Sequence, residues 1–151
     1  MAQTPSSTAP PQYRPPRVLI VEDEFMIAQL IEEMVTGLGY SVAGVARTVA
    51  EALKEYSELK FDVVLLDINL DGNRNPETAN YLLERGIPFA FVTGYDTVID
   101  PHHAHVPLLH KPFTDEELGA VLAELVGPGE VQDMMADATD SKSPPTSQQA
   151  S

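Results

Sequence analysis

The sequence predicts an α/β protein built on a doubly wound sheet of five parallel strands, and three observations point to this fold. Short aliphatic runs alternate with segments of helical period along residues 17–126. Several of these runs are apolar on both faces, as expected for strands that are covered by helices on both sides. Capping residues precede the helical segments and glycines follow them. Five such units with right-handed crossovers suit a flavodoxin-like strand order, 2-1-3-4-5.

The first half of this region contains three expected strands with two helices between them. The first helical segment ends before Gly39 and carries apolar residues at steps of three and four positions, namely Phe25, Met26, Leu30, Ile31, Met34, Val35 and Leu38. We expect this stripe to be buried, with Met26 and Met34 filling the core. Thr48–Glu51 is a capping box that opens the second helix. The expected strands span residues 17–21, 41–45 and 61–66.

The second half continues the alternation of strands and helices. Asn75 and Pro76 supply a cap and a first-turn proline to a helix that ends at Gly86. Thr114–Glu117 is another capping box and opens the last helix, which ends before Gly127. The two remaining strands are expected at residues 88–92 and 106–109.

The connection between the last two strands lacks a helical pattern. Residues 96–105 contain Pro101, few helix-forming residues and no apolar stripe. We therefore expect the fourth helix of the fold to be replaced by a single turn or by an irregular loop.

Composition and charge exclude several classes of function. The 151 residues include 23 acidic and 9 basic side chains, which gives a formal net charge of −14. This acidic excess disfavours binding to nucleic acid and to anionic membranes. The absence of cysteine excludes disulfides and thiolate metal sites. No apolar run approaches the roughly 20 residues of a membrane span, and the first residues lack a secretory signal pattern, so we expect a cytoplasmic protein.

Both ends of the chain differ from the centre in composition. Residues 1–16 are rich in Pro, Ser, Thr and Gln, and residues 127–151 are acidic and rich in Ser and Pro. Segments with so few apolar side chains bury too little surface to offset the entropy of ordering them. We expect a disordered arm, one globular domain over residues 17–126, and a disordered tail.

Residue types suited to metal and phosphate binding stand at the carboxyl ends of four expected strands. These are Glu22–Glu24, Asp67, Thr93 and Lys111. In open parallel sheets ligands bind at this edge, near the switch point of the strand order. Converging carboxylates repel one another unless a cation lies between them, and oxygen ligands favour Mg²⁺ or Mn²⁺. A lysine and a hydroxyl opposite them suit an anionic phosphoryl group, with a carboxylate as the nucleophile.

Four segments of the chain resemble the signature segments of two-component response-regulator receiver domains. Their order and spacing are specific when they are taken together, and the resemblance covers residues 17–126. In this family the bond that corresponds to Lys111–Pro112 is usually cis. The four segments are Val18–Glu24, Val64–Leu70, Val92–Gly94 and His110–Phe113.

This resemblance implies a role for each matching residue. Asp67 would accept a phosphoryl group, and Thr93 and Lys111 would bind oxygens of that group. The ligands of a Mg²⁺ or Mn²⁺ ion would be Glu22 through water, Asp23, Asp67 and the main-chain carbonyl of Asn69.

Residues 89–95 further resemble a subgroup of receivers named FATGUY after this stretch. Its members are mostly single-domain regulators, often paired with histidine kinases of the HWE or HisKA2 type. Tyr95 stands one position early for this motif, and Leu108 replaces the aromatic side chain that usually moves on activation. We therefore expect the conformational switch to involve Thr93 together with Tyr95 or residues 94–106.

These features lead to one main functional interpretation. The chain would be a stand-alone response regulator that a histidine kinase phosphorylates on Asp67. It would signal by contact with a downstream protein or act as a phosphate sink, as a monomer or a weak dimer. It would catalyse only its own phosphoryl transfer and dephosphorylation.

Two alternatives remain open at this stage. One is a degenerate receiver that binds partners without being phosphorylated. The other is a Mg²⁺-dependent phosphohydrolase of the haloacid-dehalogenase type, whose Asp-x-Asp motif is similar to Asp67-Ile68-Asn69. The second Asp of that motif is replaced here by Asn69, so the general acid would be missing.

Overall fold

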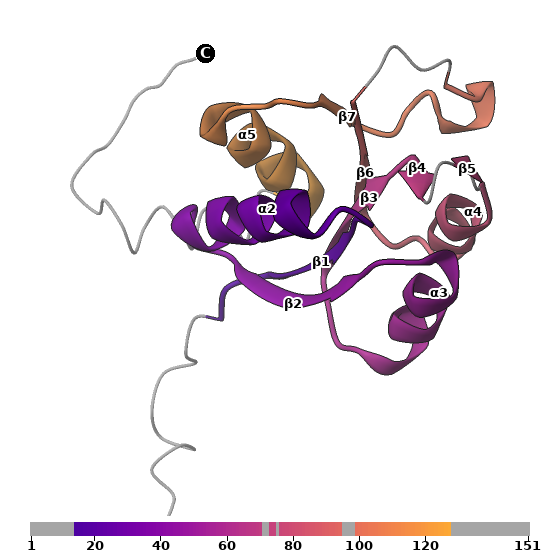
Figure 1. Cartoon of the computed structure of the whole chain (residues 1–151), viewed down its shortest axis with the longest axis horizontal. Helices are drawn as coiled ribbons and strands as arrows, with labels where there is room; N and C mark the ends of the chain where they lie inside the picture. Colours follow the sequence, from indigo (N-terminus) through magenta and orange to yellow (C-terminus); the bar gives the residue numbers. More distant parts are fainter. Residues whose placement is uncertain (1–13, 71–72, 75, 95–98, 128–151) are drawn as a thin grey trace, which may run out of the picture.

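The computed structural model describes residues 14–70, 73–74, 76–94 and 99–127, and its centre is a sheet of five parallel strands (Figure 1). Neighbouring strands follow the order β2-β1-β3-β6-β7, which confirms the predicted order 2-1-3-4-5. The strands are β1 (Arg17–Val21), β2 (Ser41–Ala46), β3 (Val63–Asp67), β6 (Phe89–Thr93) and β7 (Leu108–His110). The arm and tail expected at the two ends lie almost entirely outside the described residues.

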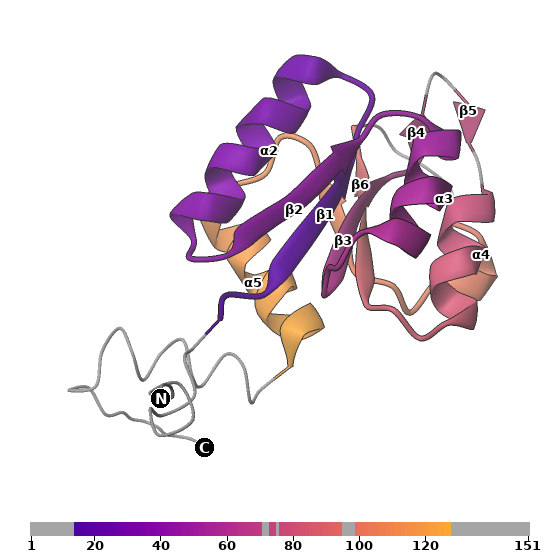
Figure 2. The same ribbon diagram turned by 90° about the horizontal axis from the view of Figure 1, so that it is seen from below.

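Helices cover both faces of the sheet. Figures 1 and 2 show α2 (Phe25–Gly37) and α5 (Asp115–Val126) on one face, and α3 (Val49–Glu58) and α4 (Pro76–Glu84) on the other. In the described part of the chain, none of the helices combines the length and the apolar composition that a bilayer-crossing helix requires. The start of β1 and the end of α5 lie at the same edge of the sheet, opposite the carboxyl ends of the strands (Figure 2).

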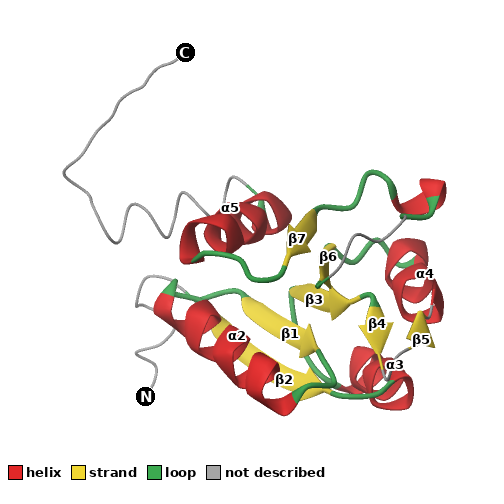
Figure 3. Ribbon diagram, turned by 45° about the horizontal axis from the view of Figure 1, so that its top comes forward, coloured by secondary structure: helices red, strands yellow, loops and turns green. Residues whose placement is uncertain are grey.

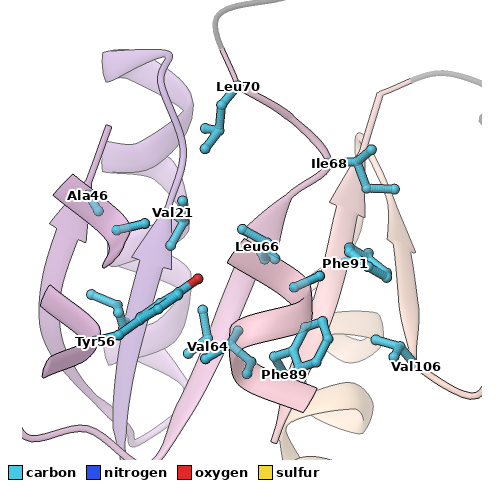
Figure 4. Close-up of a cluster of buried hydrophobic side chains, with 14 residues drawn as sticks. Val21, Ala46, Tyr56, Val64, Leu66, Ile68, Leu70, Phe89, Phe91 and Val106 are labelled. Carbon is cyan, nitrogen blue, oxygen red and sulfur yellow. The ribbon is translucent and has the colours of Figure 1, made fainter. Parts of the chain in front are cut away.

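Alternating strand side chains divide the core into two layers. In β1, Val18 and Ile20 pack beneath α2 and α5, whereas Leu19 and Val21 pack beneath α3 and α4. All four side chains are at most 1% exposed. This explains why the central strands carry apolar side chains on both faces, since each successive side chain points to the opposite face. Figure 4 shows the layer on the α3–α4 side.

The helix starts follow the capping signals in the sequence. At α5, the Thr114 hydroxyl accepts from the N–H of Glu117 at 3.0 Å, and the Glu117 carboxylate accepts from the N–H of Thr114 at 2.9 Å, so the capping box is complete. At α3, Thr48 accepts from the N–H of Glu51, but the Glu51 carboxylate accepts from the N–H of Arg47, one residue before the cap. The Asn75 cap lies outside the described residues.

One expectation about α2 is wrong. Phe25, Met26 and Leu30 are 62%, 79% and 56% exposed, so they do not belong to the buried stripe and Met26 does not fill the core. The buried face runs through Ala28, Ile31 and Val35. Because a helix advances about 100° per residue, Met26 and Leu30 lie roughly half a turn around the helix from Ala28. The apolar surface of α2 is therefore wider than the sheet can cover.

The strand boundaries differ slightly from the predicted ones. β3 begins at Val63, two residues later than expected. Just before it, the Asp62 carboxylate accepts from the N–H of Arg17 at 2.7 Å and the N–H of Asp62 donates to the carbonyl of Arg17 at 2.8 Å. Val106 is buried but precedes the last strand, which begins at Leu108. In its described residues, 99–107, the connection before β7 contains one 3₁₀ turn, η1 (Pro101–His103), and no longer helix, as the sequence predicts.

A short hairpin follows β3 and was not predicted from the sequence. β4 (Asn69–Leu70) and β5 (Asn73–Arg74) form an antiparallel pair on the α3–α4 side of the sheet (Figure 3). Two-residue strands carry too short a pattern to be recognised by alternation. Leu70 is 1% exposed and belongs to the core layer beneath α3 and α4, so it holds the hairpin against the domain.

We expect the substitution Leu70→Ala to lower the free energy of unfolding by about 2–5 kcal/mol, because it opens a cavity in that core layer. The matched substitution Leu30→Ala, at a side chain that is 56% exposed, is expected to change it by no more than about 0.5 kcal/mol. Urea unfolding of both variants measures the difference. Equal effects of the two substitutions would contradict the packing of the hairpin.

Candidate functional site

Acidic residues gather at the carboxyl ends of β1 and β3. Val21 pairs with Leu66 in the parallel register, so the next residues, Glu22 and Asp67, stand level on neighbouring strands. Asp23 follows in the loop that leads to α2. One carboxylate oxygen from each of Glu22, Asp23 and Asp67 lies within 4.8 Å of the others. The structure thus brings together three of the four acids that the sequence placed at this edge, and Glu24 is not among them.

Two of these carboxylates are buried and receive hydrogen bonds from the backbone. Glu22 is 1% and Asp67 is 6% exposed, whereas Asp23 is half-buried. The N–H of Asn69 donates to Oδ1 of Asp67 at 3.0 Å, and the N–H of Glu24 donates to Oε2 of Glu22 at 3.2 Å. The loops after both strands therefore fold back onto the carboxylates that end them.

Lys111 enters the cluster from the end of β7. Its N–H donates to the carbonyl of Thr93 at 2.7 Å, which ties the end of β7 to the end of β6. Its Nζ lies 2.8 Å from Oε1 of Glu22 and 3.7 Å from Oδ2 of Asp67, so Glu22 is the nearer partner. The bond from Lys111 to Pro112 is cis, as the resemblance implies.

The pKa values of Asp67 and Lys111 are both raised, the first mainly by burial and the second by its carboxylate partners. Burial, followed by the charge of Glu22, raises the pKa of Asp67 to about 7, although Lys111 and the N–H of Asn69 act in the opposite direction. Burial by itself would lower the pKa of Lys111. The hydrogen bond to Glu22 and the neighbouring carboxylate charges outweigh burial, so the pKa of Lys111 is raised. Lys111 therefore stays protonated, and it lies beside the carboxyl group of Asp67, which loses its proton only near pH 7.

The donor set fits a hard divalent cation. All three side chains offer oxygen, which is the ligand type of Mg²⁺ and Mn²⁺. Direct ligands at about 2.1 Å from Mg²⁺ lie at most about 4.2 Å apart, so a cluster within 4.8 Å is close to the spacing that such an ion requires. Such an ion would also relieve the repulsion that raises the pKa of Asp67. Asn69, the fourth expected ligand, adjoins Asp67 through the N–H bond described above.

Of the three residues named for the conformational switch, Thr93, Tyr95 and Leu108, the structure describes Thr93 and Leu108. Thr93 ends β6, is 0% exposed, and is joined to Lys111 through its carbonyl. Leu108 begins β7, pairs with Phe91, and packs against the core layer on the α3–α4 side. It therefore lies at the opposite end of its strand from Lys111. Tyr95 lies outside the described residues.

Sequence reasoning missed a cavity of about 400 Å³ that opens beside Asp67. Its lining includes Phe91, Ala79 and His103, from β6, α4 and η1. His103 is only 6% exposed. The missing helical pattern before β7 was the available signal, but the depth of the space beneath the turn depends on tertiary packing that this pattern does not contain.

Comparisons with known proteins agree with this geometry. Residues 18–123 match the response regulator receiver domain family. The phyllosphere-induced regulator PhyR of Methylorubrum extorquens is 39% identical over 112 residues, which cover 71% of this chain and 42% of that protein. This chain spans about half the length of the curated relatives it matches.

Two solved structures are similar in fold and in sequence. SdrG from Sphingomonas melonis Fr1 is 36% identical with a TM-score of 0.68, and the match covers 75% of this chain and 98% of that chain. The anti-anti-sigma factor PhyR from Bartonella quintana is 31% identical with a TM-score of 0.64, and the match covers 85% of this chain and 52% of that chain. The family match covers well over half of the sequence, and the chain accordingly belongs to the response-regulator receiver-domain family.

Proposed function

We propose that this receiver accepts a phosphoryl group on Asp67 from a histidine kinase and passes the signal on through protein contact. One observation carries the proposal. Three carboxylates from the ends of β1 and β3 lie within 4.8 Å of one another, and the Lys111 ammonium at the end of β7 contacts two of them. A cluster of this kind binds a divalent cation and a phosphoryl group side by side.

The transfer would use Asp67 as the nucleophile. A carboxylate oxygen of Asp67 forms a bond to phosphorus while the bond from phosphorus to the imidazole nitrogen of the kinase breaks, and the electron pair of that bond leaves with the imidazole. The N–H of Asn69 holds the other carboxylate oxygen in place. A bound Mg²⁺ ion would supply positive charge next to the phosphoryl oxygens.

Lys111 and Thr93 would bind the transferred group. Lys111 Nζ is 3.7 Å from Oδ2 of Asp67, close enough to move from Glu22 to an oxygen attached to phosphorus. Because Lys111 stays protonated over the physiological pH range, it offers that charge without a proton transfer. Thr93 ends the neighbouring strand, and its backbone carbonyl accepts from Lys111. A change in the position of either residue would therefore be transmitted to the other.

The partners are proposed to be proteins. Phe25, Met26 and Leu30 present apolar surface on the helix that follows the acidic loop, and exposed apolar patches of this kind mark contact sites. The name of the Bartonella quintana relative, an anti-anti-sigma factor, also describes action on a protein. The kinase would be of the HWE or HisKA2 type if the FATGUY resemblance holds. The role as a stand-alone regulator or a phosphate sink, and the cytoplasmic location, stay predictions.

Phosphorylation is tested with acetyl phosphate and Mg²⁺, read by intact mass. We expect the wild-type chain to gain one phosphoryl group and Asp67→Asn to gain none, because the amide cannot act as the nucleophile. Asp115→Asn, an exposed change on α5, removes the same charge and should leave labelling unchanged. Labelling of Asp67→Asn equal to wild type would reject the assignment. Repeated turnover of small phosphomonoesters would favour the phosphohydrolase alternative.

Addition of Mg²⁺ is expected to raise the melting temperature of the wild-type chain. At about 100 times the dissociation constant, mass action stabilises the folded state by about 3 kcal/mol. Asp23→Asn removes one ligand and should lose most of this shift, whereas Asp115→Asn should keep it. A melting temperature that does not respond to Mg²⁺ in any of the three proteins would instead support the degenerate receiver.

Without metal, the stability of the wild-type chain should fall as pH rises from about 4 to about 7. The pKa of Asp67 is about 7 in the folded protein and about 3.9 in the unfolded chain, so the folded state holds a proton that the unfolded state releases. Asp67→Asn lacks this titration. Urea unfolding in EDTA should show the variant up to about 4 kcal/mol more stable than wild type near pH 8, with the difference vanishing near pH 4. A difference that is independent of pH would contradict the raised pKa.

A further inference from the structure

The cavity of about 400 Å³ beside Asp67 has the size and lining of a small-molecule site. Leu66 and Phe91 project into this space from adjacent strands, on the face of the sheet shown in Figure 4. Pro76 and Ala79, in the first turns of α4, line one wall. Ligand pockets in proteins usually measure about 300–1,000 Å³ and are mostly apolar with a few polar groups, so this cavity lies within that range.

The cavity arises from the connection between β6 and β7. In its described residues, this connection contains one three-residue turn, η1, where a longer helix would cover more of the sheet. Ile99, which precedes the turn, and Pro101, which begins it, line the wall opposite α4. The cavity thus lies between α4 and η1, and residues of β3 and β6 form its base.

A hydrogen bond links the two walls. His103 of η1 is 6% exposed, and its Nε2 lies 3.1 Å from Oδ1 of Asn80 on α4. An amide oxygen only accepts hydrogen bonds, so Nε2 carries the hydrogen. The His103 ring also packs 5.4 Å from the ring of Phe91, centroid to centroid. These two contacts hold η1 at a fixed distance from α4 and from the sheet, which preforms the cavity.

Among the described residues of the lining, the charged groups are carboxylates. Asp67 and Asp100 both border the cavity. Asp100 Oδ1 accepts from the N–H of His102 at 2.9 Å, which fixes its side chain at the start of η1. Lys111 contacts Asp67, but Glu22 is its nearer partner and keeps the surroundings acidic. An anionic ligand would be repelled here, whereas a cationic group would be attracted to both aspartates.

We infer that this cavity binds a small organic molecule with an apolar ring or chain and a protonated amine. The apolar part would lie among Leu66, Ala79 and Phe91, and the amine would lie towards Asp67 and Asp100. Apolar burial supplies most of the affinity in such a site, and the two carboxylates select the sign of the ligand's charge. The inference does not depend on phosphorylation of Asp67, so it stands or falls separately from the proposed function.

The probe for this site is tryptamine, an indole ring that carries a primary amine. The isotope-labelled full chain is titrated in EDTA while amide signals are followed by NMR, so that no metal ion occupies the carboxylate of Asp67 that borders the cavity. We expect saturable shifts confined to the neighbourhood of Ala79, Phe91 and His103. Indolepropionate, with the same ring and a carboxylate, and ethylamine, with the amine alone, should each bind at least about tenfold more weakly.

Two variants and one control locate the binding. Ala79→Leu fills the cavity and should weaken tryptamine binding by about tenfold or more. Asp100→Asn keeps the oxygen that caps η1 but removes the charge, and should weaken binding about two- to fivefold. Glu84→Gln removes the same charge at an exposed position at the far end of α4 and should leave the affinity unchanged.

The outcomes separate clearly. The inference is supported if the shifts are localised and if Ala79→Leu and Asp100→Asn reduce them whereas Glu84→Gln does not. If Ala79→Leu is unstable, the comparison of Asp100→Asn with Glu84→Gln decides. Equal binding of indolepropionate overturns the choice of a cationic ligand. Shifts scattered over acidic surface residues, or no saturable shift, overturn the site itself.

Discussion

Crowding of like charges at the carboxyl edge of β1 and β3 is the constraint on which the rest of this structure depends. The parallel register sets Glu22 level with Asp67, and burial of both side chains removes the water that would otherwise screen them. The N–H groups of Glu24 and Asn69, in the segments after β1 and β3, donate hydrogen bonds to these carboxylates. The ammonium group of Lys111, which follows β7, lies next to Glu22. The apolar layers on both faces of the sheet supply the stability that this repulsion opposes.

The strand order explains how residues distant in sequence reach one site. The switch of direction between β1 and β3 leaves an open edge where neither crossover helix covers the strand ends. Glu22 and Lys111 are 89 positions apart along the chain, yet they meet because β1 and β7 both end at this edge. The backbone hydrogen bond from the N–H of Lys111 to the carbonyl of Thr93 joins the ends of β6 and β7. It therefore fixes the positions of Lys111 and Thr93 relative to each other.

The sequence was sufficient to predict features that depend on local chemistry. The five strands of the main sheet, the complete cap at Thr114 and the single turn in the described residues before β7 all follow from patterns of a few residues. It was insufficient where tertiary geometry decides. Met26 fits a helical stripe as well as Ile31 does, and only the placement of α2 on the sheet shows which of them is covered. The hairpin at Leu70 and the cavity near His103 are products of packing, which has no short pattern. The strand ends that carry acids were predictable, whereas the preference of Lys111 for Glu22 over Asp67 needed coordinates.

The shared position of the start of β1 and the end of α5, at the edge away from the acids, has a consequence for how this module is joined to other chains. Covalent attachments made directly before β1 or directly after α5 begin on the side remote from the carboxylates, so a fusion partner, a reporter or a linker that joins these two points can be added without crowding the acidic edge. New ends for a permuted chain would belong in the loop between α3 and β3, which opens on that same remote side.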